Sequence, residues 1–156
     1  MLWEKTLRTV LVAATVLAAS LTSAAASERT DVVLIARQWA DAFNNGGFST
    51  NNFPCADEAA VIDDLPPHVW QGSEACSKWY NAFSAWAATA AVTGSRITVG
   101  ATEHLEISLG YAYLVTPVTL SFLKAGKPVK DLGLLTMTLR KAETGWRIIG
   151  FAWADQ

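Results

Sequence analysis

The second half of the chain alternates long β-forming stretches with very short turns, and this pattern constrains the fold more than any other feature. Gly110, the pair Ala125-Gly126 and the pair Thr144-Gly145 separate the stretches as turn residues. Strands joined by such short links must pair antiparallel. Gly100 predicts a bend in the first stretch, and Pro117 predicts an edge position or a bulge in the second, because proline lacks a backbone donor. The predicted strands are Arg96–Ser108, Tyr111–Leu123, Val129–Lys141 and Trp146–Ala154.

The first half has the periodicity of helices. One helix is expected to begin near Thr30 as its N-cap and to end at Asn44–Gly47, since Asn and Gly accept the left-handed turn at a helix C-terminus. A second is expected to begin with Ser73 as its cap. The apolar residues that recur at three- and four-residue steps are Val32, Ala36, Trp39 and Phe43 in the first helix, and Cys76, Trp79, Tyr80, Phe83, Trp86 and Ala87 in the second.

Between the helices the pattern predicts a short strand over Glu58–Asp64. Leu65-Pro66-Pro67 ends it, since prolines cannot donate to a ladder, and Val69–Gln71 is expected to pair briefly before Gly72. Helices followed by a run of strands indicate an α+β fold. We therefore expect a curved antiparallel sheet wrapped around N-terminal helices, forming a cone with an internal pocket.

Composition excludes several function classes. The 156 residues suit one domain, and 51% hydrophobic with 17% charged residues is the reverse of a disordered chain. A net charge of −2 lacks the basic footprint of a nucleic-acid partner. His68 and His104 are far apart and belong to no cluster with ligand spacing, so no metal site is expected. No cofactor is expected either.

The N-terminus has the pattern of a secretory signal peptide. Lys5 and Arg8 precede an apolar block, Val10–Leu21, and Ala24-Ala25-Ala26 supplies a small-residue cleavage site. The alternative is a retained membrane anchor, but the Ala, Ser and Thr of the second half favour cleavage. Removing residues 1–26 from 156 would leave a 130-residue domain, 27–156, exported to the periplasm or secreted and free of the membrane.

Cys55 and Cys76 are the two cysteines of the chain. Export permits a disulfide, and an even count leaves no orphan thiol. We favour a bridge between them over two separate buried thiols. Closing a loop of this length would stabilise the fold by roughly 3 kcal/mol in the chain-entropy model.

Three segments carry a resemblance to a known fold family. They are Trp39–Gly47 (WADAFNNGG), Ala56–Asp63 (ADEAAVID) and Gly145–Ile149 (GWRII). In order and spacing the chain resembles the nuclear transport factor 2-like superfamily, the cone-shaped fold of ketosteroid isomerase and the SnoaL-like polyketide cyclases, over nearly all of residues 30–154. This fold hosts isomerases, dehydratases, cyclases and non-catalytic domains, so it does not determine function.

The resemblance implies that Asp63 stands where ketosteroid isomerase has its general base. Burial at the mouth of an apolar cavity would shift its pKa toward useful proton transfer. The alternative is that Asp63 and Asp64 form a solvated pair, and periodicity allows either of them to face inward. The isomerase also needs two oxyanion donors. In that enzyme the donors are a tyrosine and a protonated carboxylic acid. The resemblance puts Trp39 at the place of the tyrosine. The second donor would fall near the largely apolar Leu134–Met137, and Asp131 lies several residues before it.

His68 follows a stiff Pro-Pro pair and is a weaker catalytic candidate, which could move protons together with Asp63 or simply be exposed. We expect a small, largely apolar molecule in the cavity, with cofactor-independent isomerase, dehydratase or cyclase chemistry. The competing interpretation is a non-catalytic ligand-binding or dimerisation module, and the resemblance also implies a homodimer. The expected pocket-lining residues are Trp39, Phe43, Trp70, Trp79, Phe83 and Tyr113.

Overall fold

The computed structural model describes residues 25–49 and 53–156. The predicted signal peptide, residues 1–26, lies almost entirely outside the described residues. The chain divides into two units, Met1–Asp31 and Val32–Gln156. Of the first, the structure describes residues 25–31, which are helical.

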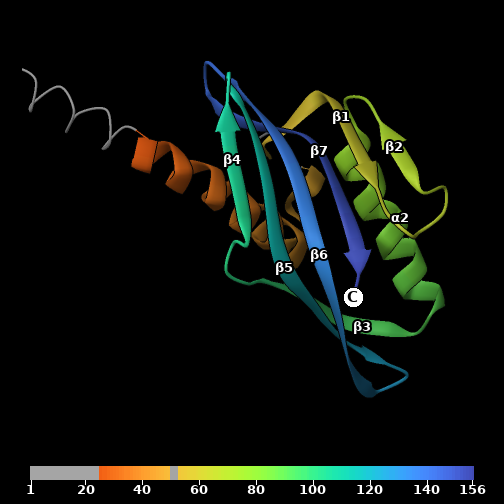
Figure 1. Ribbon diagram of the computed structural model, residues 1–156. Helices are drawn as coiled ribbons and strands as arrows, with labels where there is room; N and C mark the ends of the chain where they lie inside the picture. Colours follow the sequence, from red (N-terminus) through yellow and green to blue (C-terminus); the bar gives the residue numbers. More distant parts are fainter. Residues whose placement is uncertain (1–24, 50–52) are drawn as a thin grey trace, which may run out of the picture. The chain divides into compact units, whose positions relative to one another are not determined.

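Helical residues 25–45 come first, followed by seven strands and two further helical segments (Figure 1). The elements after the first helix are η1 (Gly47–Ser49), β1 (Cys55–Ile62), β2 (Val69–Gln71), α2 (Ala75–Thr89), β3 (Val92–Val99), β4 (His104–Ser108), β5 (Tyr111–Lys124), β6 (Lys127–Ala142) and β7 (Gly145–Asp155).

The seven strands form one curved, unclosed sheet in the order β2-β1-β7-β6-β5-β3, with β4 paired to β5 as well (Figure 1). β5, β6 and β7 are the antiparallel meander that the short turns predict. The parallel pairing of β1 with β7, in which Val61 lies opposite Phe151, was not predicted. It places the first long strand beside the last, and α2 packs against β1, β2 and β3. The expected α+β fold with a curved sheet is confirmed.

The predicted single strand Arg96–Ser108 is wrong, because it is two strands that pair with different halves of β5. β3 pairs with the C-terminal half and β4 with the N-terminal half. The chain crosses between them at Gly100, whose backbone N–H donates to the carbonyl of Pro117 (2.8 Å). A Cβ on Gly100 would lie 3.0 Å from Pro117 Cγ. Pro117 is thus neither at an edge nor in a bulge, since its missing N–H falls where β5 changes neighbours.

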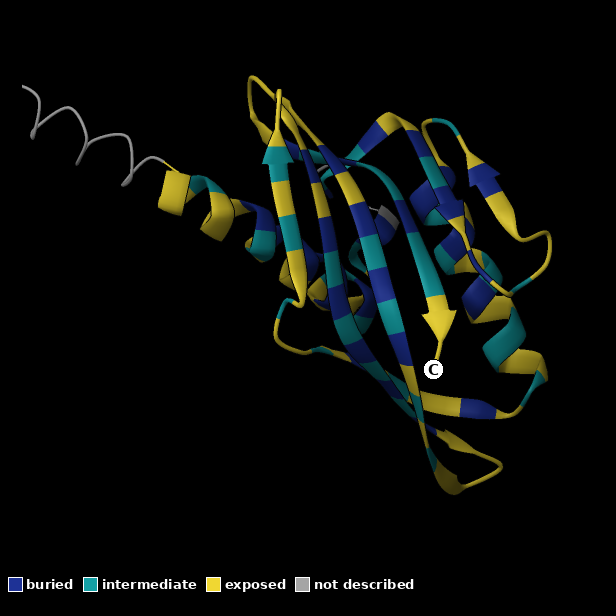
Figure 2. Ribbon diagram, in the orientation of Figure 1, coloured by how far each residue is buried: buried dark blue, intermediate teal, exposed yellow. Residues whose placement is uncertain are grey.

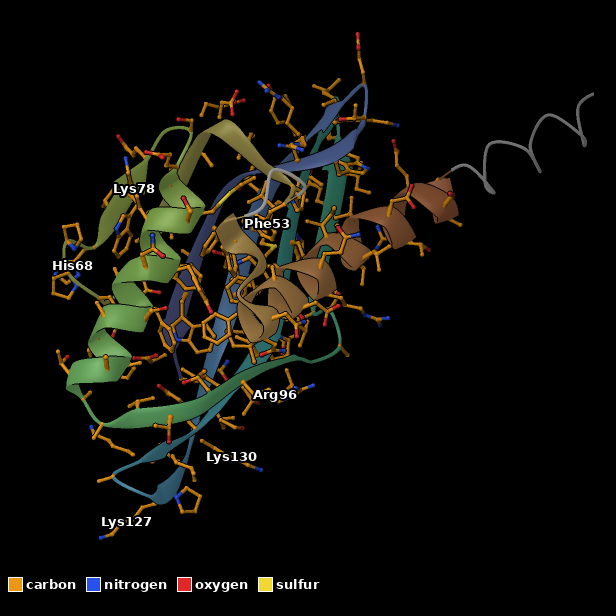
Figure 3. The ribbon with its side chains drawn as sticks, turned by 180° about the vertical axis from the view of Figure 1, so that it is seen from behind. Phe53, His68, Lys78, Arg96, Lys127 and Lys130 are labelled. Atoms are coloured by element: carbon orange, nitrogen blue, oxygen red, sulfur yellow. A yellow bond between two sulfur atoms is a disulfide. The ribbon has the colours of Figure 1, made fainter. Side chains whose placement is uncertain are left out.

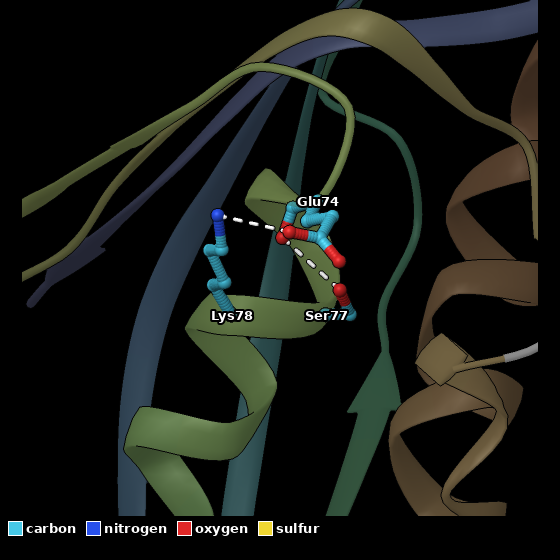
Figure 4. A network of polar contacts seen from close by, with 3 residues as sticks. All are labelled: Glu74, Ser77 and Lys78. Atoms are coloured by element: carbon cyan, nitrogen blue, oxygen red, sulfur yellow. Dashed lines mark hydrogen bonds and ion pairs between the residues drawn. The ribbon is translucent and has the colours of Figure 1, made fainter.

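Both predicted helix caps are wrong. Thr30 lies inside the first helix, where its hydroxyl donates to the carbonyl of Ala26 (3.0 Å) in the unit that ends at Asp31. α2 begins after Glu74, not Ser73, and Glu74 makes no side-chain cap hydrogen bond. Figure 4 shows the contacts of this first turn: Lys78 pairs with the Glu74 carboxylate (3.0 Å) and the Ser77 hydroxyl donates to the Glu74 carbonyl (3.0 Å).

Aromatic rings fill most of the space between the helices and the sheet. Trp39 is fully buried and stacks on Trp79 (ring centroids 5.7 Å apart), while Phe48 and Phe151 meet both rings edge-on. β5 alternates buried with more exposed residues, which separates an inner face from an outer one (Figure 2). The expected apolar stripe of the first helix is buried throughout.

A pair of side-chain hydrogen bonds and a disulfide connect the helices to the sheet. The Asn44 amide, at the end of the first helix, donates to the carbonyl of Ile97 on β3 (2.9 Å) and accepts from its N–H (2.8 Å). Cys55 at the start of β1 forms a disulfide with Cys76 in the first turns of α2, with Cα atoms 6.6 Å apart. The predicted bridge is confirmed.

Candidate functional site

A cavity of about 130 Å³ remains between α2, the end of the first helix and the inner face of the sheet. Its walls combine aromatic rings with four carboxylates, and it opens to solvent. The lining residues are Phe43, Asp63, Asp64, Leu65, Trp79, Phe83, Trp86, Ile97, Leu120, Asp131, Trp153 and Asp155.

Asp63 is the buried acid of this cavity. β1 ends at Ile62, and Asp63 continues the inward alternation of Ala59 and Val61, so its side chain is only 8% exposed. Both carboxylate oxygens are held: Oδ2 accepts from the indole Nε1–H of Trp79 (2.8 Å), and Oδ1 accepts from the backbone N–H of Leu65 (2.9 Å). The carboxylate therefore has a fixed orientation.

Burial raises the pKa of Asp63 from 3.8 to about 6. The cause is desolvation, because the low-dielectric wall disfavours the charged form. The hydrogen bonds from Leu65 and Trp79 oppose this, since they stabilise the carboxylate, while the nearby Asp64 adds to the rise. Asp63 is thus an acid that exchanges its proton close to neutral pH.

Three further carboxylates lie on the cavity wall. Asp64 and Asp155 are exposed and Asp131 is half-buried. Burial raises the pKa of Asp131, and the negative charges of Asp155 and Asp64 add to the rise. Asp155 also accepts a hydrogen bond from the Trp153 indole N–H (2.7 Å). The mouth of the cavity therefore carries a negative potential.

Strand pairing brings these acids together. Gly133 on β6 lies opposite Asp155 on β7, which sets the end of β7 beside the inward-facing segment that begins at Asp131. A Cβ on Gly133 would lie 2.7 Å from the Trp153 ring and 2.9 Å from the Ala154 carbonyl. Glycine is needed here because the indole that forms the cavity wall packs directly on the backbone of β6.

The structure separates the predicted pocket residues into two groups. Phe43, Trp79 and Phe83 line the cavity together with Asp63. Trp39 and Trp70 are buried in the hydrophobic core and are not among the lining residues.

Tyr113, the remaining residue of the predicted pocket lining, also lies outside the cavity. It is 44% exposed on the outer face of the sheet, 5.8 Å from the ring of His104. Its neighbours Ala112 and Leu114 are buried, so strand alternation directs Tyr113 away from the inner face.

Trp39 does not supply the donor that its position suggested. Its indole N–H is buried with no hydrogen-bond partner in the described part of the chain, while Trp79 donates to Asp63 instead. The two rings stack, and the packing of one helix on the other determines which indole N–H reaches the carboxylate.

His68 lies on the exposed loop between β1 and β2, on the outside of the molecule (Figure 3). Its ring contacts the backbone carbonyl of Asp63 (Nδ1 to O, 3.3 Å), and the Asp63 N–H donates to the His68 carbonyl (3.2 Å). The His68 side chain thus contacts the backbone of Asp63 and not its carboxylate. Together the two contacts connect the ends of the loop that joins β1 to β2.

Sequence reasoning missed Asp155 as a cavity residue and named Asp131 only as a displaced donor. The alternation of side chains along the last strand indicates this position. Every second residue faces the same side, so Phe151, Trp153 and Asp155 share one face, and Phe151 is in the core. Extending that face to the strand's end would have placed Asp155 at the inner mouth.

Two findings bear on cellular location. None of the helices among residues 25–49 and 53–156 is long and apolar enough to span a bilayer. The Cys55–Cys76 disulfide is compatible with an extracellular environment.

Comparisons with known proteins support the fold. No family model matches the chain, and no curated protein matches it by sequence. Solved structures match it strongly. An NTF2-like protein with a cystatin-like fold from Novosphingobium aromaticivorans superposes with a TM-score of 0.73 at 12% identity, covering 87% of this chain and 86% of that one.

Two further solved structures agree. An NTF2-like superfamily protein from Salmonella enterica serovar Typhimurium gives a TM-score of 0.68 at 12% identity, covering 84% of this chain and 92% of that one. A protein from Mycobacterium tuberculosis, described as of unknown function, gives 0.70 at 15% identity, covering 86% and 75%. The chain therefore has the fold of the nuclear transport factor 2-like superfamily.

Proposed function

We propose that the protein binds a small, largely apolar molecule in this cavity and that Asp63 transfers a proton to or from it. The observation that carries the proposal is the Asp63 carboxylate, buried in the cavity wall and oriented by the Trp79 indole and the Leu65 N–H. The chemistry would be a cofactor-independent isomerase, dehydratase or cyclase step.

The shifted pKa of Asp63 suits this role. A group with a pKa of about 6 is mostly ionised at neutral pH, yet it is a stronger base than an ordinary aspartate. The two hydrogen bonds hold the carboxylate in one orientation before the substrate binds, so the base is preorganised. Phe43, Phe83 and Ile97 supply the apolar wall against which a ring or short chain packs.

A probe reaction tests the proton-transfer role without knowledge of the natural substrate. Nitrobenzisoxazole opens when a base removes its ring C–H proton: the N–O bond breaks, its electron pair goes to the oxygen, and a coloured cyanophenolate forms. We expect the wild-type protein to accelerate this reaction with a rate that rises as Asp63 ionises around pH 6. Asp63→Asn should lower the rate by about a hundredfold or more, the lower bound for a positioned general base.

The matched control is Asp57→Asn, since Asp57 is an exposed aspartate of β1 outside the cavity wall. It should leave the rate and its pH profile unchanged. Equal rates for wild type and Asp63→Asn would refute the catalytic role. Binding of the probe without acceleration would favour the non-catalytic ligand-binding module.

A homodimer is a second proposal, and the outer face of the sheet supports it. Leu132 and Ile62 are 53% and 56% exposed there. Leu134, opposite Ala154 on the neighbouring strand, extends the same apolar surface. We expect light scattering to give a dimer for wild type and a monomer for Leu132→Asp.

The control for the dimer is Leu109→Asp, at a turn residue that is 95% exposed. This variant should remain dimeric. A monomeric wild type, or a dimer that survives Leu132→Asp, would contradict the dimer.

Export is the third proposal, supported by the N-terminal pattern and by the disulfide. Intact mass of the protein from the periplasm or medium should correspond to a chain beginning near Ser27. A full-length chain retained in the membrane fraction would contradict cleavage.

A further inference from the structure

The charges on the cavity wall are all of one sign. Among the residues that the structure describes, twelve line the cavity: four of them are aspartates, and none is Lys, Arg or His. Two ion pairs are seen among the described residues, Lys78–Glu74 and Arg140–Glu58, and neither involves these aspartates. The wall therefore carries a negative charge that no described side chain of the cavity lining balances.

The aromatic part of the wall favours the same charge. Trp86 and Trp153 are half-buried at the cavity, so part of each ring remains accessible to a ligand. The face of an indole attracts a cation through its quadrupole. The indole N–H groups of Trp79 and Trp153, which could recognise an anion, already donate to Asp63 and Asp155.

The space and the arrangement of the acids indicate an organic cation. A cavity of 130 Å³ is close to the roughly 150 Å³ of an apolar cavity that takes up benzene, so it holds about one ring. Within the part of the chain that the structure describes, no three acidic, His or Cys side chains are grouped so as to hold a metal ion. Asp64, Asp131 and Asp155 line an open cavity together with aromatic rings, and this combination suits a larger, diffuse cation.

We propose that the cavity selects an amine: a ligand with an apolar group of about one ring, seated among Phe43, Phe83 and Ile97, and an ammonium at the mouth between Asp131, Asp155 and the face of Trp153. This inference rests on the proposed function and names the ligand class of the same site. The ammonium forms charge-assisted hydrogen bonds with the carboxylates, and these are stronger than hydrogen bonds between neutral groups.

Three probes that share one ring and differ in charge test the inference: benzylammonium, benzyl alcohol and benzoate. Binding is followed through the NMR signals of the Trp79 and Trp153 indole N–H groups at neutral pH and low salt. We expect benzylammonium to bind at least about tenfold more tightly than benzyl alcohol, and benzoate to bind most weakly. Added salt should reduce the preference for the cation, because it screens the partly exposed carboxylates.

The variant that separates charge from cavity shape is the double substitution Asp131→Asn with Asp155→Asn. It should weaken benzylammonium binding about tenfold or more and leave benzyl alcohol binding within about twofold. Asp57→Asn removes one negative charge outside the cavity and should change neither.

The outcomes distinguish this inference from the proposed function. If benzyl alcohol binds as tightly as benzylammonium, or the double variant keeps the full affinity for the cation, the amine inference is wrong and the apolar cavity function stands. If none of the three probes shifts the two indole signals, both the inference and the proposed function fail.

Discussion

Replacing Asp63 by asparagine should change how stability depends on pH. Burial raises the pKa of Asp63 in the folded protein from 3.8 to about 6, so the folded state binds this proton more tightly than the unfolded state does. Between these two pH values the folded protein retains a proton that the unfolded chain has lost. The free energy of unfolding therefore falls as the pH rises through this window, and the fall is complete above about pH 6.

The magnitude follows from the size of the shift. A rise from 3.8 to about 6 corresponds to an upper limit of roughly 3 kcal/mol. Because the cavity opens to water, we take about half of this, roughly 1.5 kcal/mol, as the expected effect. Asparagine cannot ionise, so this pH-dependent part disappears in Asp63→Asn. The amide still loses one of the two hydrogen bonds, which lowers stability equally at every pH.

Urea unfolding of both proteins at several pH values between about 4 and 7 gives the measurement. The difference in the free energy of unfolding between wild type and Asp63→Asn should change by about 1.5 kcal/mol across this range. As the pH rises, wild type should lose more stability than the variant. Other acids, including Asp131, titrate in both proteins and cancel in the difference. Asp57→Asn should run parallel to wild type. Parallel curves for Asp63→Asn as well would refute the buried-acid reasoning.

Three further predictions concern the surroundings of the site. Trp79→Phe removes a donor that stabilises the Asp63 carboxylate, so NMR titration should place the pKa of Asp63 above its wild-type value; a fall would contradict the assigned role of the indole. Replacing Cys55 and Cys76 together by serine should lower the free energy of unfolding by roughly 3 kcal/mol, measured by urea unfolding, and an unchanged midpoint would mean that the bridge does not constrain the unfolded chain. Gly133→Ala should cost about 1–3 kcal/mol and change the tryptophan fluorescence, because its Cβ displaces the indole in the cavity wall; a variant with wild-type stability and spectrum would exclude that close packing.

The elements that could be predicted from sequence are those with a strong local signal. The apolar stripe of the first helix and the turns at Gly110 and Gly126 depend on neighbouring residues, and the structure bears them out. The break between β3 and β4 was missed, although Gly100 predicted a bend. A bend and a break look alike locally, and pairing with the two halves of β5 makes this one a break.

The candidate site was only partly predictable for the same reason. Periodicity left open whether Asp63 or Asp64 faces inward; both line the cavity, and the hydrogen bond with Trp79 accounts for the burial of Asp63 while Asp64 is exposed. Asp131 and Asp155 reach the same cavity through the pairing of β6 with β7, which no local pattern encodes. The electrostatic character of the mouth is therefore a property of the tertiary structure.

The parallel pairing of β1 with β7 has a consequence for how the site assembles. Val61 and Phe151 pair although most of the domain's sequence lies between them. Their pairing therefore closes a far longer loop than the hairpins of the meander do, or than the disulfide does, whose cysteines are 21 residues apart. Long loops are the slower ones to close, because more chain entropy is lost before contacts form. The hairpins and the cysteine-linked segment, which contains Asp63 and ends close to Trp79, can thus order early, while the part of the cavity wall on β7 joins them in a late step. Until then Trp153 and Asp155 are missing from the cavity wall, so its acidic mouth is completed last.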